Sequence, residues 1–284
     1  MTTLERMRSD LASIVSDLGA LMADVSIERL DRSGNIVFVF PDYYWSGLSP
    51  KQQGEQLSIK RRYDQWYELA QKLLAGAPKH IAQELHKANQ HFREWVEFSQ
   101  NWSLRPSHEA NLGRLDKNAQ ALHLLLDILA TDTESATILV PDTNSLLASA
   151  DPTRYRPLVD NTPFIFLLMP TILRELDELK MLHRNPEVRD KAKAAITRIK
   201  GWRQQGNLAS GVTVDRDITV RAVSREPQME KSLSWLDSSV PDDRLIACLL
   251  ETIAEFPSAH ITLVTGDINL QNKADTAGIP VKEL

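Results

Sequence analysis

Apolar residues recur at helical spacing through most of the first 130 residues. Side chains three or four positions apart share one face of a helix, so helices are predicted from Leu4 to Met22 and from Leu115 to Ala130. Two aromatic stripes predict further helices between them: Ile59, Tyr63, Trp66, Ala70 and Leu73, then Ile81, Leu85, Ala88, Phe92, Trp95 and Trp102. Rings at this spacing are expected to fill a core rather than to stack on bases.

A short β-hairpin is predicted after the first of these helices. Val25 and Ile27 precede a turn cluster at residues 31–35, and Ile36, Phe38 and Phe40 follow it. The cluster contains Gly and Asn, which tolerate the positive φ that tight hairpin turns require. Residues 1–130 are therefore expected to form a mostly helical domain with a β-hairpin.

Beyond residue 136 the pattern changes to continuous apolar runs that alternate with helical stretches. Three runs predict strands: Thr137 to Val140, Phe164 to Met169 and Ile261 to Thr265. Such runs are typical of parallel strands that helices cover on both faces. We predict a three-layer α/β/α domain over 137–284 with a central, mainly parallel sheet, and a polar linker at 131–136. The length of 284 residues also suits two domains.

Composition indicates a soluble globular protein. Cys248 is the only cysteine, which excludes an intrachain disulfide and suits a buried core position. The N-terminal residues lack a basic stretch followed by an apolar one, and no apolar run is long enough to span a bilayer. We expect a cytoplasmic protein without membrane association. The net charge of −5 gives no overall attraction for nucleic acid, so a polyanion would need a local basic patch.

Acidic residues follow the predicted strands or begin the predicted helices. Asp142 and Asp267 come directly after strands, while Glu175 and Asp243 lie near the starts of helices. Each position has a simpler explanation, because Asp caps helix N-termini and acids there interact favourably with the helix dipole. Ligand sites in parallel sheets, however, lie beyond the carboxyl ends of the strands. A shared acidic site is therefore the competing hypothesis.

The ordered set of these motifs resembles the PIN domain, a family of metal-dependent nucleases. Four strings between Thr137 and Leu284 carry the resemblance: VPDTNSLL, PTILRELDELK, DDRLIACLL and LVTGDINLQNKADTAGIPV. It implies that Asp142, Glu175, Asp243 and Asp267 are the catalytic and metal-binding residues. Asn144, Asp242, Thr265 and Asn269 are expected to support them.

Carboxylates gathered without His or Cys favour Mg²⁺ or Mn²⁺ over Zn²⁺. We hypothesise that Asp142, Asp243 and Asp267 bind one or two such ions, while Glu175 completes the shell or steers the attacking water. The expected reaction is hydrolysis of single-stranded RNA, with RNA more probable than DNA as substrate. The resemblance implies products with a 5′-phosphate and a 3′-hydroxyl.

Cations beside and beyond Glu175 could hold substrate phosphates, with Arg174, Lys180 and Arg184 as the candidates. The competing interpretation is a solvated helix face with ion pairs between turns. Residues 1–130 match no family that we recognise and are expected to bind a protein partner or to regulate the nuclease.

Two other functions are compatible with parts of this pattern. A haloacid dehalogenase-like phosphatase also has an Asp after a strand, but its second Asp is replaced by Asn144, and Gln271 stands four residues after Asp267. That alternative fails at both motifs. A non-catalytic domain of the same fold, binding RNA or protein, remains as the alternative to a nuclease.

Overall fold

The computed structural model describes residues 2–29, 42–99, 104–130 and 136–284. The chain divides into two compact units, Leu4–Ala130 and Thr131–Leu284, with the first three residues assigned to the second unit. The predicted linker, 131–136, lies outside the described residues except for Ala136, whose C=O accepts a hydrogen bond from His260 N at 2.8 Å. None of the described helices is both long and apolar enough to cross a membrane.

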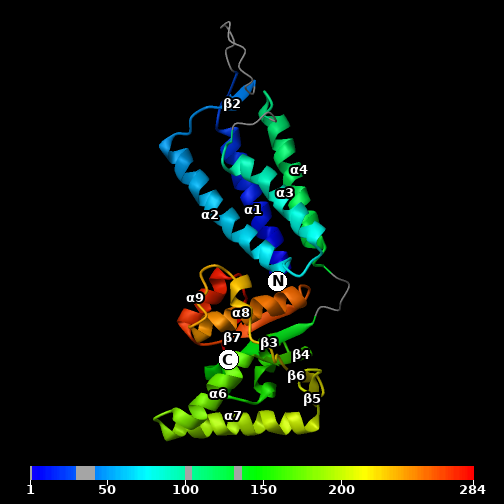
Figure 1. The fold of residues 1–284 in the computed structure, drawn as a ribbon, viewed down its shortest axis with the longest axis vertical. Coiled ribbons are helices and arrows are strands. Elements are labelled where there is room, and N and C mark those ends of the chain that lie inside the picture. The colour runs from blue at the N-terminus through cyan, green and yellow to red at the C-terminus, as the bar shows by residue number, and fades with distance from the viewer. Residues whose placement is uncertain (1, 30–41, 100–103, 131–135) are drawn as a thin grey trace. The chain divides into compact units, whose positions relative to one another are not determined.

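The N-terminal unit consists of helices that run alongside one another, as predicted (Figure 1). Trp66 Nε1 donates to Met7 O at 2.8 Å, and Tyr63 Oη donates to Asn89 Oδ1 at 3.0 Å. These bonds satisfy the polar ends of buried rings, so the aromatic stripes do fill the core. The elements are α1 (Thr3–Ala23), β1 (Ile27–Arg29), β2 (Tyr43–Trp45), α2 (Pro50–Leu73), α3 (Lys79–Val96) and α4 (His108–Asp127).

The predicted hairpin is present as an antiparallel pair of β1 and β2, with Glu28 opposite Tyr44. Its second strand is Tyr43–Trp45, later in the chain than the predicted Ile36 to Phe40, which lies outside the described residues. Trp102 also lies outside them. The aromatic residues of β2 have high strand propensity.

The C-terminal unit is a three-layer α/β/α domain. Its six-stranded sheet has the order β5-β6-β4-β3-β7-β8, and every pairing is parallel except that of β5 with β6. The strands are β3 (Thr137–Pro141), β4 (Phe164–Leu168), β5 (Val212–Asp215), β6 (Ile218–Ala222), β7 (His260–Val264) and β8 (Val281–Lys282). The three predicted strands are thus confirmed as β3, β4 and β7, and they occupy the centre of the sheet.

Helices cover both faces of this sheet. Helices α6 and α7 lie on one side, while α8 and α9 lie on the other (Figure 1). The elements between the strands are α5 (Thr143–Ala148), the 3₁₀ helix η1 (Pro152–Val159), α6 (Pro170–Leu182), α7 (Pro186–Gln205), the 3₁₀ helix η2 (Met229–Lys231), α8 (Pro241–Glu255) and α9 (Ile268–Thr276). Cys248 is buried in α8, and burial raises the pKa of its thiol to about 12, in agreement with the predicted core role.

Candidate active site

The chain changes direction across the sheet between β3 and β7. From β3 it continues to β4 on one side, and from β7 to β8 on the other. A gap between diverging connections of this kind is where parallel sheets usually bind ligands. Asp142 stands directly after β3 at this point. Its backbone N–H donates at 2.9 Å to the carbonyl oxygen of Val264, which is the last residue of β7.

Thr265 joins the acids that follow these two strands. Its hydroxyl donates to Asp142 Oδ2 at 2.5 Å and accepts the backbone N–H of Asp267 at 3.0 Å. Thr265 is completely buried, and Asp142 is only 4% exposed. One hydroxyl therefore contacts both acidic segments. A supporting role for Thr265 in a metal site stays a prediction.

Asp142 and Asp267 also cap the helices that they precede. Asp142 Oδ1 accepts from Ser145 N at 2.6 Å at the start of α5, and Asp267 Oδ1 accepts from Asn269 N at 2.8 Å at the start of α9. The capping explanation is thus correct for both residues. It does not exclude an acidic site, because a carboxylate that caps through one oxygen still has lone pairs on the other.

Glu175 is brought toward Asp142 through the hydroxyl of Thr143. This hydroxyl donates to Glu175 Oε2, and Thr143 is the next residue after Asp142. Burial raises the pKa of Glu175, the bond from Thr143 opposes that shift, and the negative charge of Asp242 raises the pKa further. Glu175 therefore holds its proton more tightly than an ordinary glutamic acid.

Asp243 is buried at the start of α8 and has protein partners at both oxygens. Its Oδ2 accepts from Asp237 N at 2.9 Å, while its Oδ1 lies 2.6 Å from Lys273 Nζ. Asp242, the predicted auxiliary, lies 3.4 Å from the same ammonium. Burial alone would lower the pKa of Lys273, but its close ion pair with Asp243 and the charge of Asp242 raise it.

The four acids are linked in two groups. The Thr265 hydroxyl connects the carboxylate of Asp142 with the backbone of Asp267, and Thr143, the neighbour of Asp142 in the chain, bonds Glu175. Asp243 instead pairs with Lys273. Within the described residues, no three Asp, Glu, His or Cys side chains are close enough together to hold a metal ion. The donors are all carboxylate oxygens, and their chemistry fits a hard cation such as Mg²⁺ or Mn²⁺. For Asp243 to bind a metal ion together with Asp142 and Asp267, its ion pair with Lys273 would have to open or rearrange.

Two predicted supporting residues lie at the same edge with exposed side chains. Asn144 is in the first turn of α5, and Asn269 is in the first turn of α9. It is the backbone N–H of Asn269 that contacts Asp267. A direct role for either amide side chain stays a prediction.

The candidate phosphate-binding cations belong to α6 and the loop after it. Arg174 Nη1 lies 3.4 Å from Glu226 Oε1, and Lys180 Nζ lies 3.5 Å from Asp177 Oδ1. Arg184 is exposed between α6 and α7. Surface pairs of this kind contribute little to stability, so they do not prevent the cations from contacting phosphate.

Sequence reasoning missed Thr143 and Lys273. Thr143 has a recognisable signal, because a hydroxyl next to the first acid can reach a second carboxylate. Lys273 has none, because lysines are common on helix surfaces and only the packing of α8 beside α9 brings it to Asp243.

A comparison with protein-family models tests the resemblance independently. The PIN domain matches residues 139–284, half of the chain, and this region includes all four acids. The chain belongs to the PIN domain family. PIN domains usually have a nuclease fold that works with a divalent metal. A search of curated proteins gave no match.

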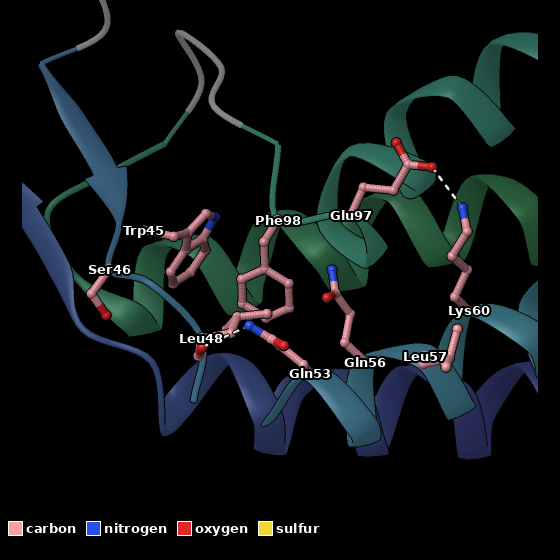
Figure 2. A pocket seen from close by; sticks show the side chains of 9 residues that line it. All are labelled: Trp45, Ser46, Leu48, Gln53, Gln56, Leu57, Lys60, Glu97 and Phe98. Carbon is pink, nitrogen blue, oxygen red and sulfur yellow. Dashed lines mark hydrogen bonds and ion pairs between the residues drawn. The ribbon is translucent and has the colours of Figure 1, made fainter. Parts of the chain in front are cut away.

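The unit that precedes the PIN domain contains a pocket of about 720 Å³ (Figure 2). Trp45 and Phe98 form one end with their ring centroids 5.2 Å apart, and the ion pair of Lys60 with Glu97, at 2.8 Å, forms the other. The pocket thus combines an aromatic wall with opposite charges. Its remaining lining residues are Ser46, Leu48, Gln53, Gln56 and Leu57.

Proposed function

We propose that the protein is a divalent-metal-dependent ribonuclease that hydrolyses single-stranded RNA. The observation that carries the proposal is the Thr265 bridge between Asp142 and Asp267 at the point where the sheet connections diverge. A buried hydroxyl that holds two carboxylate segments together opposes their mutual repulsion. Membership of the PIN family supports the same function.

Asp142, Asp243 and Asp267 are the residues that would hold Mg²⁺ or Mn²⁺. A bound ion of this type supplies positive charge to the phosphodiester and lowers the pKa of a coordinated water. The protein's own contribution is to orient Asp142 through Thr265 and Ser145 N, Asp243 through Asp237 N, and Asp267 through Asn269 N. Both oxygens of Asp142 are held in this way, while Asp243 and Asp267 each have one oxygen held by a backbone N–H.

Glu175 is the candidate for completing the metal shell or for steering the attacking water. Its raised pKa supports the second role, because a more basic carboxylate accepts a proton from water more readily. The hydroxyl of Thr143 fixes Oε2, which sets the orientation of the carboxylate. Arg174, Lys180 and Arg184 would neutralise substrate phosphates without selecting a base sequence.

The decisive experiment measures cleavage of end-labelled single-stranded RNA and matching DNA by the full-length protein. Cutting is expected with Mg²⁺ or Mn²⁺ and not with EDTA, and RNA is expected to be the better substrate. Asp142→Asn should lower the rate by more than about 100-fold, since even residues behind metal ligands are commonly worth 10–100-fold. Asp190→Asn is the matched control, because Asp190 is an exposed acid on α7.

The non-catalytic alternative predicts a different result from the same assay. An RNA-binding module would retain the labelled RNA without metal-dependent cutting, and Asp142→Asn would leave the binding unchanged. Binding that falls with added salt would then reflect only the cations of α6. Equal absence of cutting in the wild type and in Asp142→Asn would reject the nuclease.

For residues 1–130 we propose a protein-partner or regulatory role. The pocket between Trp45 and Lys60 supports it, because aromatic rings beside exposed charges are common in recognition surfaces. We also propose a cytoplasmic location, which the single cysteine supports.

A further inference from the structure

Lys273 lies among the acids of the candidate site. It belongs to α9, the helix that begins after Asp267, and its Nζ lies 2.6 Å from Asp243 Oδ1 and 3.4 Å from Asp242 Oδ2. The side chain of Asp243 is 8% exposed and that of Lys273 is 28% exposed. The ammonium therefore neutralises a carboxylate that has little access to water.

This position brings Lys273 into competition with a metal ion. Asp243 Oδ2 already accepts from Asp237 N, so the oxygen that a cation would share is Oδ1, which faces Lys273. An ammonium carries one positive charge and a divalent ion carries two. Since both are attracted by the same carboxylate, the lysine must move away or share the oxygen when an ion binds.

We propose that Lys273 is an internal counter-ion that holds Asp243 until a divalent cation replaces it, and that it thereby sets the cation concentration at which the site fills. This inference rests on the proposed function, because it assigns Asp243 to the metal. Lys273 is a positioning residue in this scheme. Its ammonium stabilises the metal-free arrangement of the buried acid and opposes metal binding by the same interaction.

Lysine suits this role better than arginine would. Its ammonium is a compact charge on a flexible stem, so it can leave Asp243 without moving α9. A guanidinium would hold the carboxylate through two parallel bonds and release it less easily. The flexible stem lets Lys273 pair with Asp243 when no cation is present and move away from Asp243 when a cation binds.

The test is Mn²⁺ binding by the full-length protein, followed through the electron paramagnetic resonance signal of free Mn²⁺. Lys273→Met should bind Mn²⁺ about tenfold more tightly than the wild type, since a competing charge has been removed. Lys193→Met is the matched control. Lys193 also pairs with an acid, Asp190 at 3.4 Å, but on the exposed surface of α7. Its removal changes the net charge equally and should leave the Mn²⁺ affinity unchanged.

Thermal unfolding supplies a second measurement that does not depend on activity. Lys273→Met should unfold at a lower temperature than the wild type in EDTA and gain more from added Mn²⁺. Lys273→Gln, which keeps an N–H donor toward Asp243, replaces Met if that variant does not fold. An affinity of the Lys273 variant within about twofold of the wild type, or weaker, overturns the inference.

Asp142→Asn separates this inference from the proposed function. If the wild type binds Mn²⁺ and Asp142→Asn does not, the metal site stands, and the Lys273 variant decides the counter-ion role alone. If the wild type and Asp142→Asn bind Mn²⁺ equally weakly, the metal site itself is rejected and the inference is rejected with it.

Discussion

At the scale of single residues, the hydroxyl of Thr265 is the most important polar group of the candidate site. It is buried and joins two acidic segments, donating to Asp142 and accepting from Asp267 N. A buried polar group that loses its partner retains the cost of leaving water. The two segments should therefore depend on this hydroxyl even when no cation is bound.

We expect Thr265→Val to lower the free energy of unfolding by about 1–3 kcal/mol in EDTA, because it leaves buried groups unpaired. Thr265→Ser keeps the hydroxyl and should lose less, chiefly through the missing methyl group. Urea unfolding followed by circular dichroism measures both variants. Equal losses for Val and Ser would mean that the methyl group, and not the hydroxyl, stabilises this edge of the sheet.

The sequence was sufficient to select the four candidate acids, but it did not indicate which residues contact them. Asp142, Glu175, Asp243 and Asp267 could be selected from the sequence because each stands at the end of a strand or near the start of a helix. Lys273 could not be, because the partner of a long side chain depends on which helices pack together. Its contact with Asp243 exists only after α8 and α9 are placed side by side.

At the scale of elements, the central strands were predictable and the edge strands were not. β3, β4 and β7 are continuous apolar runs, as expected for buried parallel strands. β5 and β6 form an antiparallel hairpin at the edge, where apolar and polar residues alternate from Val212 to Ala222. Such alternation differs from the continuous apolar runs that predicted the central strands, and no strand was predicted there. β8 has only two residues, too few to show a pattern.

Gly211 permits the entry into this edge hairpin. Its φ of 106° is unfavourable for other residues, and a Cβ there would lie 2.9 Å from Thr219 Cγ2. We expect Gly211→Ala to lower the melting temperature, with a loss of about 1–3 kcal/mol from backbone strain and crowding. Thermal unfolding measured by calorimetry would detect it.

Gly201→Ala is the matched control for that variant. Gly201 lies inside α7, and an added Cβ would meet no atom within 4 Å. Alanine should therefore stabilise the helix by about 0.5–1 kcal/mol. If both variants shifted the melting temperature in the same direction, the conformation described for Gly211 would be wrong.

At the scale of the whole molecule, the two units have separate cores. Within the helical unit, Trp66 donates to Met7, and Tyr63 donates to Asn89 and packs against Phe92. We expect a fragment of residues 1–130 to be helical by circular dichroism and to unfold cooperatively without the PIN domain. Phe92→Ala should destabilise the fragment and the full chain alike, by about 3–5 kcal/mol.

A fragment that showed no cooperative unfolding would contradict this expectation and make the helical unit dependent on the PIN domain. A smaller effect of Phe92→Ala in the full chain than in the fragment would point to the same dependence. Size exclusion chromatography of the fragment would separate a folded monomer from an aggregate.

The pairing of β3 with β7 also limits how this site can change during evolution. Pro141 lies opposite Val264 in the parallel register, and the next residues, Asp142 and Thr265, are joined by a hydrogen bond. Strand side chains alternate between the two faces, so inserting one residue into either strand would turn Asp142 or Thr265 toward the opposite face and break the hydrogen bond between them. Natural variants of this active site should therefore differ in side-chain identity or in the loops beyond Asp267, while the lengths of β3 and β7 remain constant.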